Sequence, residues 1–342
     1  MSLDDFIQAM PKAELHVHLE GSTRPETLLE LARRNGVSLP AQDVPGLQAL
    51  YQFKDFSHFI DVYMLILSCL RTPEDWTMIV RSLGAEMDRQ NIRYAEVTWT
   101  PSTSVRPDLP FSALLAAVEE GCRQAQRTWG VMMRWLPDAA RDLGPEAALQ
   151  AARYCVEGQG HGILGLGLGG SENLYPPELF VSAFALAKQA GLKSYPHAGE
   201  LAGPTSIWNA LRLLHADRIG HGVRAIEDPE LVAYLRERQI TIDICPTSNI
   251  ALHVYPDYAA HPLRQLYEAG VPVTLNSDDP PLFNTTLVQE YRLAAHVFGF
   301  GADELCSLGL QAVRASFLPE EEKARLEREF SEEYERLKRR YL

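Results

Sequence analysis

The sequence lacks the cysteine pairs, basic clusters and long apolar segments that define several classes of protein. Its five cysteines lie far apart and include no C-x-x-C pair, so we expect buried, reduced thiols, at least one of them unpaired. A formal net charge of −13 argues against a non-specific hold on nucleic acid or on an anionic membrane. The most apolar stretch, 62–70, is about half as long as a membrane span requires.

The amino-terminal residues also lack the features of a targeting segment. The run MSLDDFIQAM is acidic and leads into Pro11, with no basic region ahead of an apolar one. We therefore expect a soluble, cytoplasmic protein that has no membrane or nucleic-acid partner.

What the sequence does contain is an alternation of strand and helix patterns. Segments that combine apolar or β-branched runs with Gly, Pro or Asp stops predict eight strands, at 14–20, 93–101, 131–137, 163–170, 192–200, 218–222, 241–248 and 273–280. Apolar residues at helical spacing lie between most of them, as in 177–190, 204–214 and 228–238. In the last of these, Asp228 is a suitable cap and Pro229 a suitable first residue.

This alternation predicts an α/β fold of the (β/α)8 TIM-barrel type, in one domain over 1–342. A doubly wound open sheet is the alternative, but polar residues follow five different strands, whose ends meet at one mouth only in a barrel. Extra helices are expected in 22–90, and an amphipathic helix in the tail 319–342. The aromatic segment 53–59 fits core packing or an apolar lid over the mouth equally well.

The first predicted strand carries two histidines in an H-x-H arrangement. Residues two apart on a strand point the same way, so His16 and His18 face together, with Glu20 next in line. Polar side chains on a strand buried on both faces are costly without a partner. A pair of hydrogen-bonded core histidines would satisfy them, but a metal ion at the opening of an α/β repeat is the favoured interpretation.

Three further clusters end later strands. His197 precedes a break in the chain and Glu200, and His221 stands between two glycines that permit close approach of another group. Asp278 and Asp279 are adjacent carboxylates, which alone would indicate a turn or a helix cap. Beside histidines on neighbouring strands, they indicate a cation instead.

The ligand set inferred from these clusters is His16, His18, His197 and Asp278. Imidazole nitrogens with one carboxylate suit zinc better than magnesium or calcium, while iron or another transition ion stays open. The predicted fourth strand does not end in a lysine that could bridge two metals. We expect one zinc ion per chain.

Taken in order, these segments resemble the adenosine deaminase family of amidohydrolase barrels. The resemblance is carried by PKAELHVHLEG at 11–21, LGGSE at 168–172, HAGE at 197–200, GHG at 220–222, CPTSN at 245–249 and SDDP at 277–280. No single motif is decisive, but the ordered set spans nearly the whole chain. The resemblance implies hydrolytic release of ammonia from C6 of an aminopurine, with the zinc ligands named above.

The same resemblance implies roles for the remaining site residues. Glu200 protonates N1 of the purine, and its pKa should rise as the bound ring excludes water. His221 takes or orients the proton of the attacking water, while Asp279 touches that water and accepts a hydrogen bond from the base at N7. The backbone of Gly170 meets N3, and Glu20 lies where the family binds the ribose side of the substrate.

One departure from the family pattern concerns the substrate. Adenosine deaminases usually have Asp in place of Glu20, where it contacts the ribose 5′-hydroxyl, whereas adenine deaminases of the family have Glu. The motifs are nevertheless more similar to bacterial proteins that act on 6-aminodeoxyfutalosine in menaquinone synthesis. That nucleoside carries a carboxylated aryl ketone at its 5′ side, for which Arg24 is a candidate partner.

The favoured hypothesis is therefore a zinc-dependent deaminase of an adenine nucleoside, with 6-aminodeoxyfutalosine ahead of adenosine. Adenine deaminase and a barrel hydrolase of another bond are the alternatives. A non-catalytic binding protein would be expected to have lost a catalytic residue, and all of them are present. The zinc deaminases that edit nucleic acids are excluded, because their H-x-E and P-C-x-x-C pair is missing.

Overall fold

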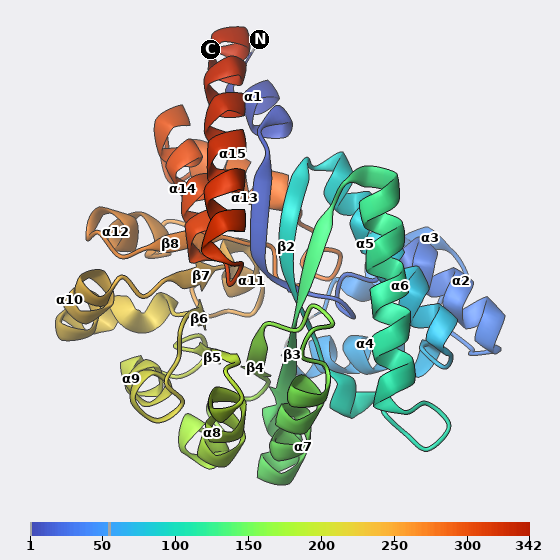
Figure 1. The fold of residues 1–342 in the computed structure, drawn as a ribbon. Helices are drawn as coiled ribbons and strands as arrows, with labels where there is room; N and C mark the ends of the chain where they lie inside the picture. Colours follow the sequence, from blue (N-terminus) through green and yellow to red (C-terminus); the bar gives the residue numbers. More distant parts are fainter. Residues whose placement is uncertain (1, 54–55) are drawn as a thin grey trace.

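The structure, a computed structural model, describes residues 2–53 and 56–342 and contains an eight-stranded parallel sheet. Its order is that of the chain, and helices surround the strands (Figure 1). The strands are β1 Lys12–His18, β2 Ile92–Trp99, β3 Met132–Ala140, β4 Gly165–Gly169, β5 Lys193–Ala198, β6 Ile219–His221, β7 Ile242–Ile244 and β8 Val273–Leu275. The prediction of a (β/α)8 barrel is confirmed.

The helices alternate with these strands, with additional ones after β1 and at the end. They are α1 Leu3–Ala9, α2 Pro25–Asn35, α3 Val44–Tyr51, α4 Phe56–Cys69, α5 Pro73–Arg89, α6 Phe111–Trp129, α7 Gly144–Glu157, α8 Val181–Gln189, α9 Pro204–Leu213, α10 Pro229–Arg238, α11 Pro246–Ala251, α12 Leu263–Glu268, α13 Leu287–His296, α14 Ala302–Ala315 and α15 Glu320–Tyr341. The predicted helix 177–190 is divided into the 3-10 helix η3 Pro177–Phe180 and α8. The predicted cap is confirmed, since Asp228 accepts hydrogen bonds from the first turn of α10.

Most predicted strands extend too far at their carboxyl ends. The segment predicted over 241–248 leaves the sheet after Ile244, because Pro246 begins α11 and has no N–H to donate to a ladder. The segment predicted over 273–280 ends at Leu275. The residues beyond these ends form the loops of the barrel mouth, where function concentrates in this fold.

The barrel closes between β8 and β1 with the help of a side chain. The backbone of Asp278 bonds to β1 on both sides, accepting from His18 N at 2.9 Å and donating to His16 O at 3.1 Å. The side-chain oxygen of Asn276 accepts from Leu15 N at 2.8 Å and from His16 N at 3.1 Å. A buried amide therefore provides pairing that backbone carbonyls provide elsewhere in the barrel.

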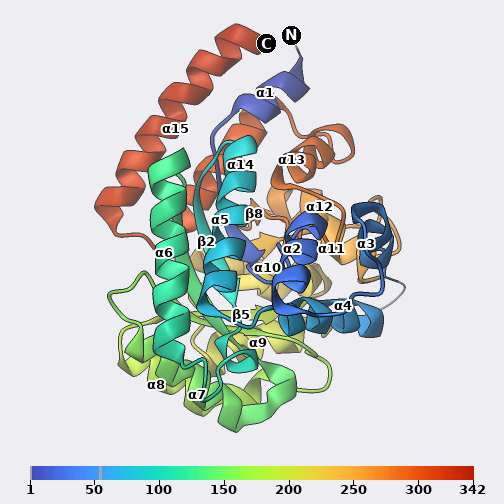
Figure 2. The ribbon, with the colours of Figure 1, turned by 90° about the vertical axis from the view of Figure 1, so that its right-hand side faces the viewer.

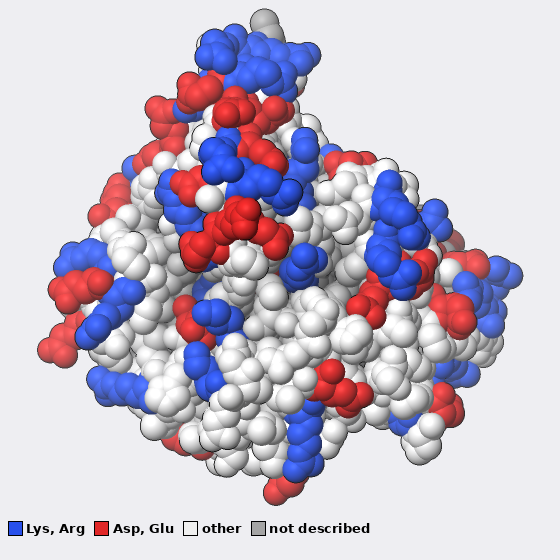
Figure 3. Space-filling view, in the orientation of Figure 1, with Lys and Arg blue, Asp and Glu red and all other residues white. Residues whose placement is uncertain are grey.

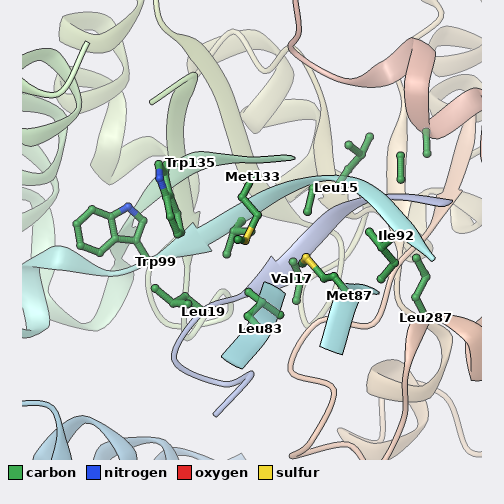
Figure 4. Packing of buried hydrophobic residues seen from close by; sticks show 14 of the residues in the cluster. Leu15, Val17, Leu19, Leu83, Met87, Ile92, Trp99, Met133, Trp135 and Leu287 are labelled. Atoms are coloured by element: carbon green, nitrogen blue, oxygen red, sulfur yellow. The ribbon is translucent and has the colours of Figure 1, made fainter. Parts of the chain in front are cut away.

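The two faces of β1 have different chemistry. Leu15, Val17 and Leu19 are fully buried against the surrounding helices, and Figure 4 shows Val17 beside Leu83 and Met87 of α5. His16 and His18 alternate with them and point into the barrel. Apolar packing on one face thus fixes the direction of the polar side chains on the other.

Helices α2, α3 and α4 form the predicted insertion after β1 and lie together on one side of the barrel (Figure 2). Phe53 precedes α4 instead of sharing its face, and residues 54–55 lie outside the described residues. The Phe59 ring stacks on Phe283 with centroids 5.6 Å apart, and the Phe53 ring contacts both. Phe53 and Phe59 therefore pack, and Phe59 also lines the mouth, so for these two residues core packing and a place at the mouth do not exclude each other.

The tail forms the predicted amphipathic helix, and the surface carries charges of both signs. Buried residues of α15 include Phe330 and Tyr334, whose hydroxyl donates to Pro11 O at 2.9 Å. On the face in Figure 3, acidic and basic side chains alternate along α15, which begins with Glu320 and ends with basic residues. Across the described ranges, no helix combines the length and hydropathy that a membrane span requires.

Candidate active site

Four predicted histidines converge at the carboxyl ends of β1, β5 and β6. The ring of His16 lies 4.5 Å from that of His197 and 4.6 Å from that of His221, between centroids. His18 lies 5.3 Å from His197. All four are buried, with exposed fractions of 8% or less. Residues about 200 positions apart in the chain thus share one pocket, as expected for barrel strands.

Asp278 joins these histidines from the loop after β8. Its Oδ1 lies 3.3 Å from His16 Nε2 and 3.2 Å from His18 Nε2, and its Oδ2 accepts from Ser248 Oγ at 2.6 Å. Its φ of 65° is in the left-handed region, which non-glycine residues enter mainly where surrounding contacts impose it. The backbone pairing of Asp278 with β1 is such a contact.

The residues present fit a metal ion. Donor atoms within 4.8 Å of one another occur in overlapping groups, one with His16 and His197, others with Asp278 and either His16 or His18. Among the described residues, neither ring nitrogen of buried His16 has a hydrogen-bond partner. Its Nε2 lies 3.3 Å from Asp278 Oδ1, but this contact does not have the geometry of a hydrogen bond. Buried polar atoms without partners are costly, and a cation bound by nitrogen and oxygen donors would satisfy them.

The electrostatics of the cluster also point to a cation. Burial opposes protonation of His18, but the carboxylates of Asp279 and Asp278 outweigh it and raise its pKa to about 10. Burial likewise opposes ionisation of Asp278, yet the neighbouring His16 and His18 hold its pKa well below its usual range. The site thus favours a positive charge beside Asp278, in the position that a metal ion would take.

Glu200 and His221 lie side by side in the cavity wall, with Oε2 and Nε2 3.5 Å apart. Burial, together with Asp278 and Glu172, raises the pKa of Glu200 well above its usual range. Burial lowers the pKa of His221 to about 3. The pair can therefore present a protonated carboxyl group and a neutral imidazole at neutral pH.

The turn that carries Glu200 is held by a carboxylate that the sequence analysis left without a role. Glu172 accepts from Gly199 N at 2.6 Å and from Ser206 Oγ at 2.5 Å through Oε1. Its Oε2 accepts from the backbone of Glu200, Leu201 and Ala202 at 2.9–3.1 Å. Glu172 was quoted within the LGGSE motif, but only the fold reveals its partners.

A cavity of about 280 Å³ opens beside these groups. Its lining combines polar groups with the apolar side chains Phe59, Ile60, Tyr63, Met64, Leu67, Leu143, Leu252 and Phe283. Of these, Ile60, Met64 and Leu143 are exposed and form the outer wall. Among the described residues that line it, none is lysine or arginine, whereas Asp138 and Asp142 are present. The outer wall is therefore apolar apart from the exposed carboxylate of Asp142.

Asp138 is a further polar group that the sequence analysis missed. It lies near the end of β3, lines the cavity, and accepts from Thr100 Oγ1 at 2.6 Å. Burial raises its pKa above the usual value. Its position one residue past the predicted strand 131–137 was the available signal.

Predicted substrate-contacting residues differ in where the structure places them. Asp279 and Gly170 line the cavity, and a side chain at Gly170 would collide with Asp142. Glu20 is fully buried and is not among the described lining residues. Its Oε1 accepts from Thr100 N at 2.9 Å. Arg24 is paired with Glu86 at 2.5 Å in a separate pocket, so it is not the cation at the mouth that the sequence analysis suggested.

Sequence comparisons place this chain among known deaminases. The family model described as adenosine deaminase matches residues 11–333. Aminodeoxyfutalosine deaminase of Streptomyces coelicolor is 42% identical over 326 residues, which cover 95% of this chain and 84% of the relative. Adenine deaminase of Rhizobium etli is 40% identical over 312 residues, covering 91% and 96% of the two chains.

Solved structures agree with this placement. A zinc-bound amidohydrolase from Burkholderia ambifaria has a TM-score of 0.90 at 29% identity and covers 98% of this chain and 93% of its own. Adenine deaminase of Arthrobacter aurescens also has a TM-score of 0.90, at 31% identity, with coverages of 95% and 99%.

Proposed function

The chain belongs to the adenosine deaminase family and is a hydrolytic deaminase of aminopurines, and from that premise we propose that it acts on an adenine nucleoside with an apolar 5′ extension. 6-Aminodeoxyfutalosine is the favoured substrate, ahead of adenosine. The observation that carries this choice is the set of apolar side chains exposed at the cavity opening, Ile60, Met64 and Leu143, which suit an aryl group.

We propose that one zinc ion is held by His16, His18, His197 and Asp278, in agreement with the unsatisfied nitrogens of His16. When bound, zinc supplies Lewis acidity that lowers the pKa of water from 15.7 to about 7. The chain's own contribution is to keep His197 neutral as a nitrogen donor. Burial acts in that direction at His197, whose pKa is held well below its usual range by burial and by the neighbouring histidines.

The proton that N1 of the purine must receive is assigned to Glu200. A carboxyl group with a raised pKa holds that proton at neutral pH, and its position in the cavity beside His221 suits transfer to the ring. Protonation at N1 withdraws electrons from C6 and favours attack there. His221 takes or orients the proton of the attacking water at Nε2.

Asp279 and Gly170 are assigned to the remaining ring nitrogens. Burial and the adjacent Asp278 raise the pKa of Asp279 well above its usual range, so its protonated carboxyl group can donate to N7. This reverses the direction in which the sequence analysis drew that hydrogen bond, because N7 of a neutral purine carries no proton. The backbone of Gly170 faces N3 from the cavity wall.

The cavity also discriminates between substituents of the nucleoside. An aryl group would contact Ile60, Met64 and Leu143, whose side chains are partly exposed at the opening. A 5′-phosphate would meet Asp138 and Asp142 without a lining cation. We therefore expect poor turnover of adenosine monophosphate compared with uncharged adenosine.

Free adenine is the second candidate substrate. It is favoured by Glu20, which replaces the Asp that binds a ribose hydroxyl in the family pattern, and by the Rhizobium relative. Against it, the bare base would leave the apolar outer wall in contact with water.

We extend the proposal to a cytoplasmic enzyme of menaquinone synthesis with one domain over 1–342.

A substrate panel tests the proposal. Purified, zinc-loaded protein is given 6-aminodeoxyfutalosine, adenosine, adenine and adenosine monophosphate, and ammonia release and the ultraviolet spectrum are recorded. The highest kcat/KM is expected for 6-aminodeoxyfutalosine. A preference for adenine would establish the second candidate, and turnover of esters without aminopurines would overturn the assignment.

Two variants separate proton transfer from metal binding. Glu200→Gln should keep stoichiometric zinc while kcat falls about 10²–10⁴-fold. Asp278→Ala should instead lose zinc, as measured by elemental analysis. Full activity in both variants would contradict the assigned roles.

A further inference from the structure

A continuous set of hydrogen bonds runs from the backbone of α12 to His221. We propose that His261 and Asn249 are positioning residues that hold His221 in the tautomer protonated at Nε2, so that it presents a hydrogen-bond donor to the cavity. Leu263 N, His261, Asn249 and His221 follow one another in this chain, and all four residues are at most 3% exposed.

The first bond of the chain has a fixed direction. A backbone N–H can only donate, and Leu263 N lies 3.2 Å from His261 Nδ1, which must therefore be an unprotonated acceptor. Burial lowers the pKa of His261 to about 3, so its ring is neutral. A neutral imidazole with a bare Nδ1 carries its proton on Nε2.

That proton fixes the orientation of the next amide. His261 Nε2 lies 3.1 Å from Asn249 Oδ1, which accepts its hydrogen. The backbone carbonyl of Asn249, within α11, accepts from Val254 N at 2.9 Å, which holds the residue in place. With Oδ1 directed at His261, the amide nitrogen Nδ2 is directed at His221.

The last bond assigns the catalytic-site imidazole. Asn249 Nδ2 lies 3.3 Å from His221 Nδ1, and because an amide NH2 group only donates, Nδ1 is the acceptor. An imidazole that accepts a hydrogen bond at Nδ1 carries its proton on Nε2. That atom lies 3.5 Å from Glu200 Oε2 and 3.9 Å from Asp278 Oδ2, two oxygens toward which an N–H group is favourable.

The opposite assignment fails at the same contacts. A proton on His221 Nδ1 would face the amide hydrogens of Asn249, and rotating that amide would direct them against the protonated Nε2 of His261. Facing donors in a buried site leave hydrogen bonds unmade. The orientation that follows from Leu263 N is thus the one that satisfies every contact in the chain.

This tautomer has a consequence for catalysis that rests on the proposed function. The proposed function allows His221 either to take the proton of the attacking water or to orient that water. With Nε2 already protonated, the resting enzyme uses His221 to orient and stabilise the attacking oxygen as a donor. The tautomer itself follows from the hydrogen bonds alone.

Nitrogen NMR of the side chains tests the tautomer directly. Protein with 15N-labelled histidine is measured as the zinc-loaded enzyme and after chelation, and His221→Gln assigns the resonances. We expect Nε2 of His221 at the shift of a protonated nitrogen and Nδ1 at that of a bare one, in both states. A protonated Nδ1 with a bare Nε2 in the wild-type protein would overturn the proposal.

Two substitutions with different hydrogen-bonding capacity extend the test. Asn249→Asp replaces the donor with an acceptor, so Nδ1 of His221 should become protonated and kcat should fall by about 10²–10⁴-fold with little change in KM. His261→Gln supplies an amide that can donate to Asn249 Oδ1, so the wild-type tautomer should persist. An unchanged His221 spectrum in folded, zinc-bound Asn249→Asp would contradict the role of Asn249.

The outcomes separate this proposal from the function on which its consequence rests. A wild-type protein with the expected tautomer but without activity on aminopurines would overturn the proposed function alone. An active deaminase with the other tautomer would overturn the positioning role alone.

Discussion

At the scale of single residues, the site depends on groups that never reach the substrate. Glu172 is 2% exposed and accepts hydrogen bonds from the turn that carries Glu200 and from Ser206. Its partners are uncharged donors, most of them backbone N–H groups, so a carboxylate with two accepting oxygens is the matching side chain. Its contribution is to fix the turn that positions the Glu200 side chain.

Glu172→Gln should therefore impair catalysis without removing the metal. One accepting oxygen becomes an NH2 group that faces donors, which we expect to displace the turn, lower kcat about 10–100-fold and cost about 1–3 kcal/mol of unfolding free energy. Steady-state kinetics, zinc analysis and urea denaturation measure these effects. Glu178→Gln, at an exposed carboxylate bonded to Asn209, is the control. Wild-type kinetics in Glu172→Gln would show that the turn holds its shape without this anchor.

Sequence reasoning succeeded for residues with a periodic signal and failed for residues defined by contact. His16 and His18 were predicted to share a face because strand geometry requires it, and they do. Glu172 and His261 carry no such signal, since their partners lie 27 or more residues away or depend on a loop conformation. The chemical roles of the predicted residues stay predictions.

At the scale of elements, the closing pair of strands differs from the others. β8 is three residues long, and the loop after it pairs with β1 through Asn276 and Asp278. Asn276 is fully buried and also donates to Thr274 Oγ1 at 2.9 Å. Its amide holds together the two strands that position His16 and Asp278.

Replacing this amide by a similarly sized apolar group should weaken the pairing between β8 and β1, the seam at which the barrel closes. Asn276→Leu leaves the N–H groups of Leu15 and His16 without acceptors, at about 1–3 kcal/mol each. We expect the free energy of unfolding to fall by about 2–5 kcal/mol in urea titrations, together with weaker zinc retention. Asn209→Ala on the outer helix α9 should change stability by less than about 0.5 kcal/mol. Equal effects of the two substitutions would argue against a special role for the seam.

The elements themselves were largely predictable, and their ends were not. All eight strands and the helices α9, α10 and α15 occur where apolar spacing and turn residues indicated them. The carboxyl ends were overextended where a buried loop or helix follows the strand directly, as at residues 245–248, which belong to α11 or its N-cap. Pro246 was the overlooked signal, since proline favours the first turn of a helix.

At the scale of the whole molecule, buried acids tie helices to the barrel. Glu290 of α13 is fully buried, accepts from Thr247 N at 3.2 Å and is also bonded by Thr285. Burial raises its pKa from 4.5 to about 7, although the bonds from Thr247 and Thr285 oppose the rise. The folded protein thus binds this proton more tightly than the unfolded chain does.

Stability should consequently fall as pH rises through this window. The contribution of Glu290 is fully present below about pH 4.5 and is lost as pH rises through about 7, for a total of up to about 3 kcal/mol. In Glu290→Gln this dependence is removed, so zinc-free variant protein should gain stability relative to wild type between about pH 5 and pH 8. Denaturant titrations across that range measure the difference.

Glu237→Gln, at an exposed position on α10, is the matched control and should leave the pH profile unchanged. A constant stability difference between wild type and Glu290→Gln across the window would show that Glu290 titrates normally.

The seam between β8 and β1 also bears on when, during synthesis of the chain, the proposed metal site can be completed. The proposed ligands His16 and Asp278 come from the first strand and from the loop after the last, so a nascent chain on the ribosome has only part of the pocket. At about 5–20 residues per second, the interval between their synthesis is on the order of tens of seconds. The proposed set of four ligands is therefore complete only once residue 278 has been synthesised.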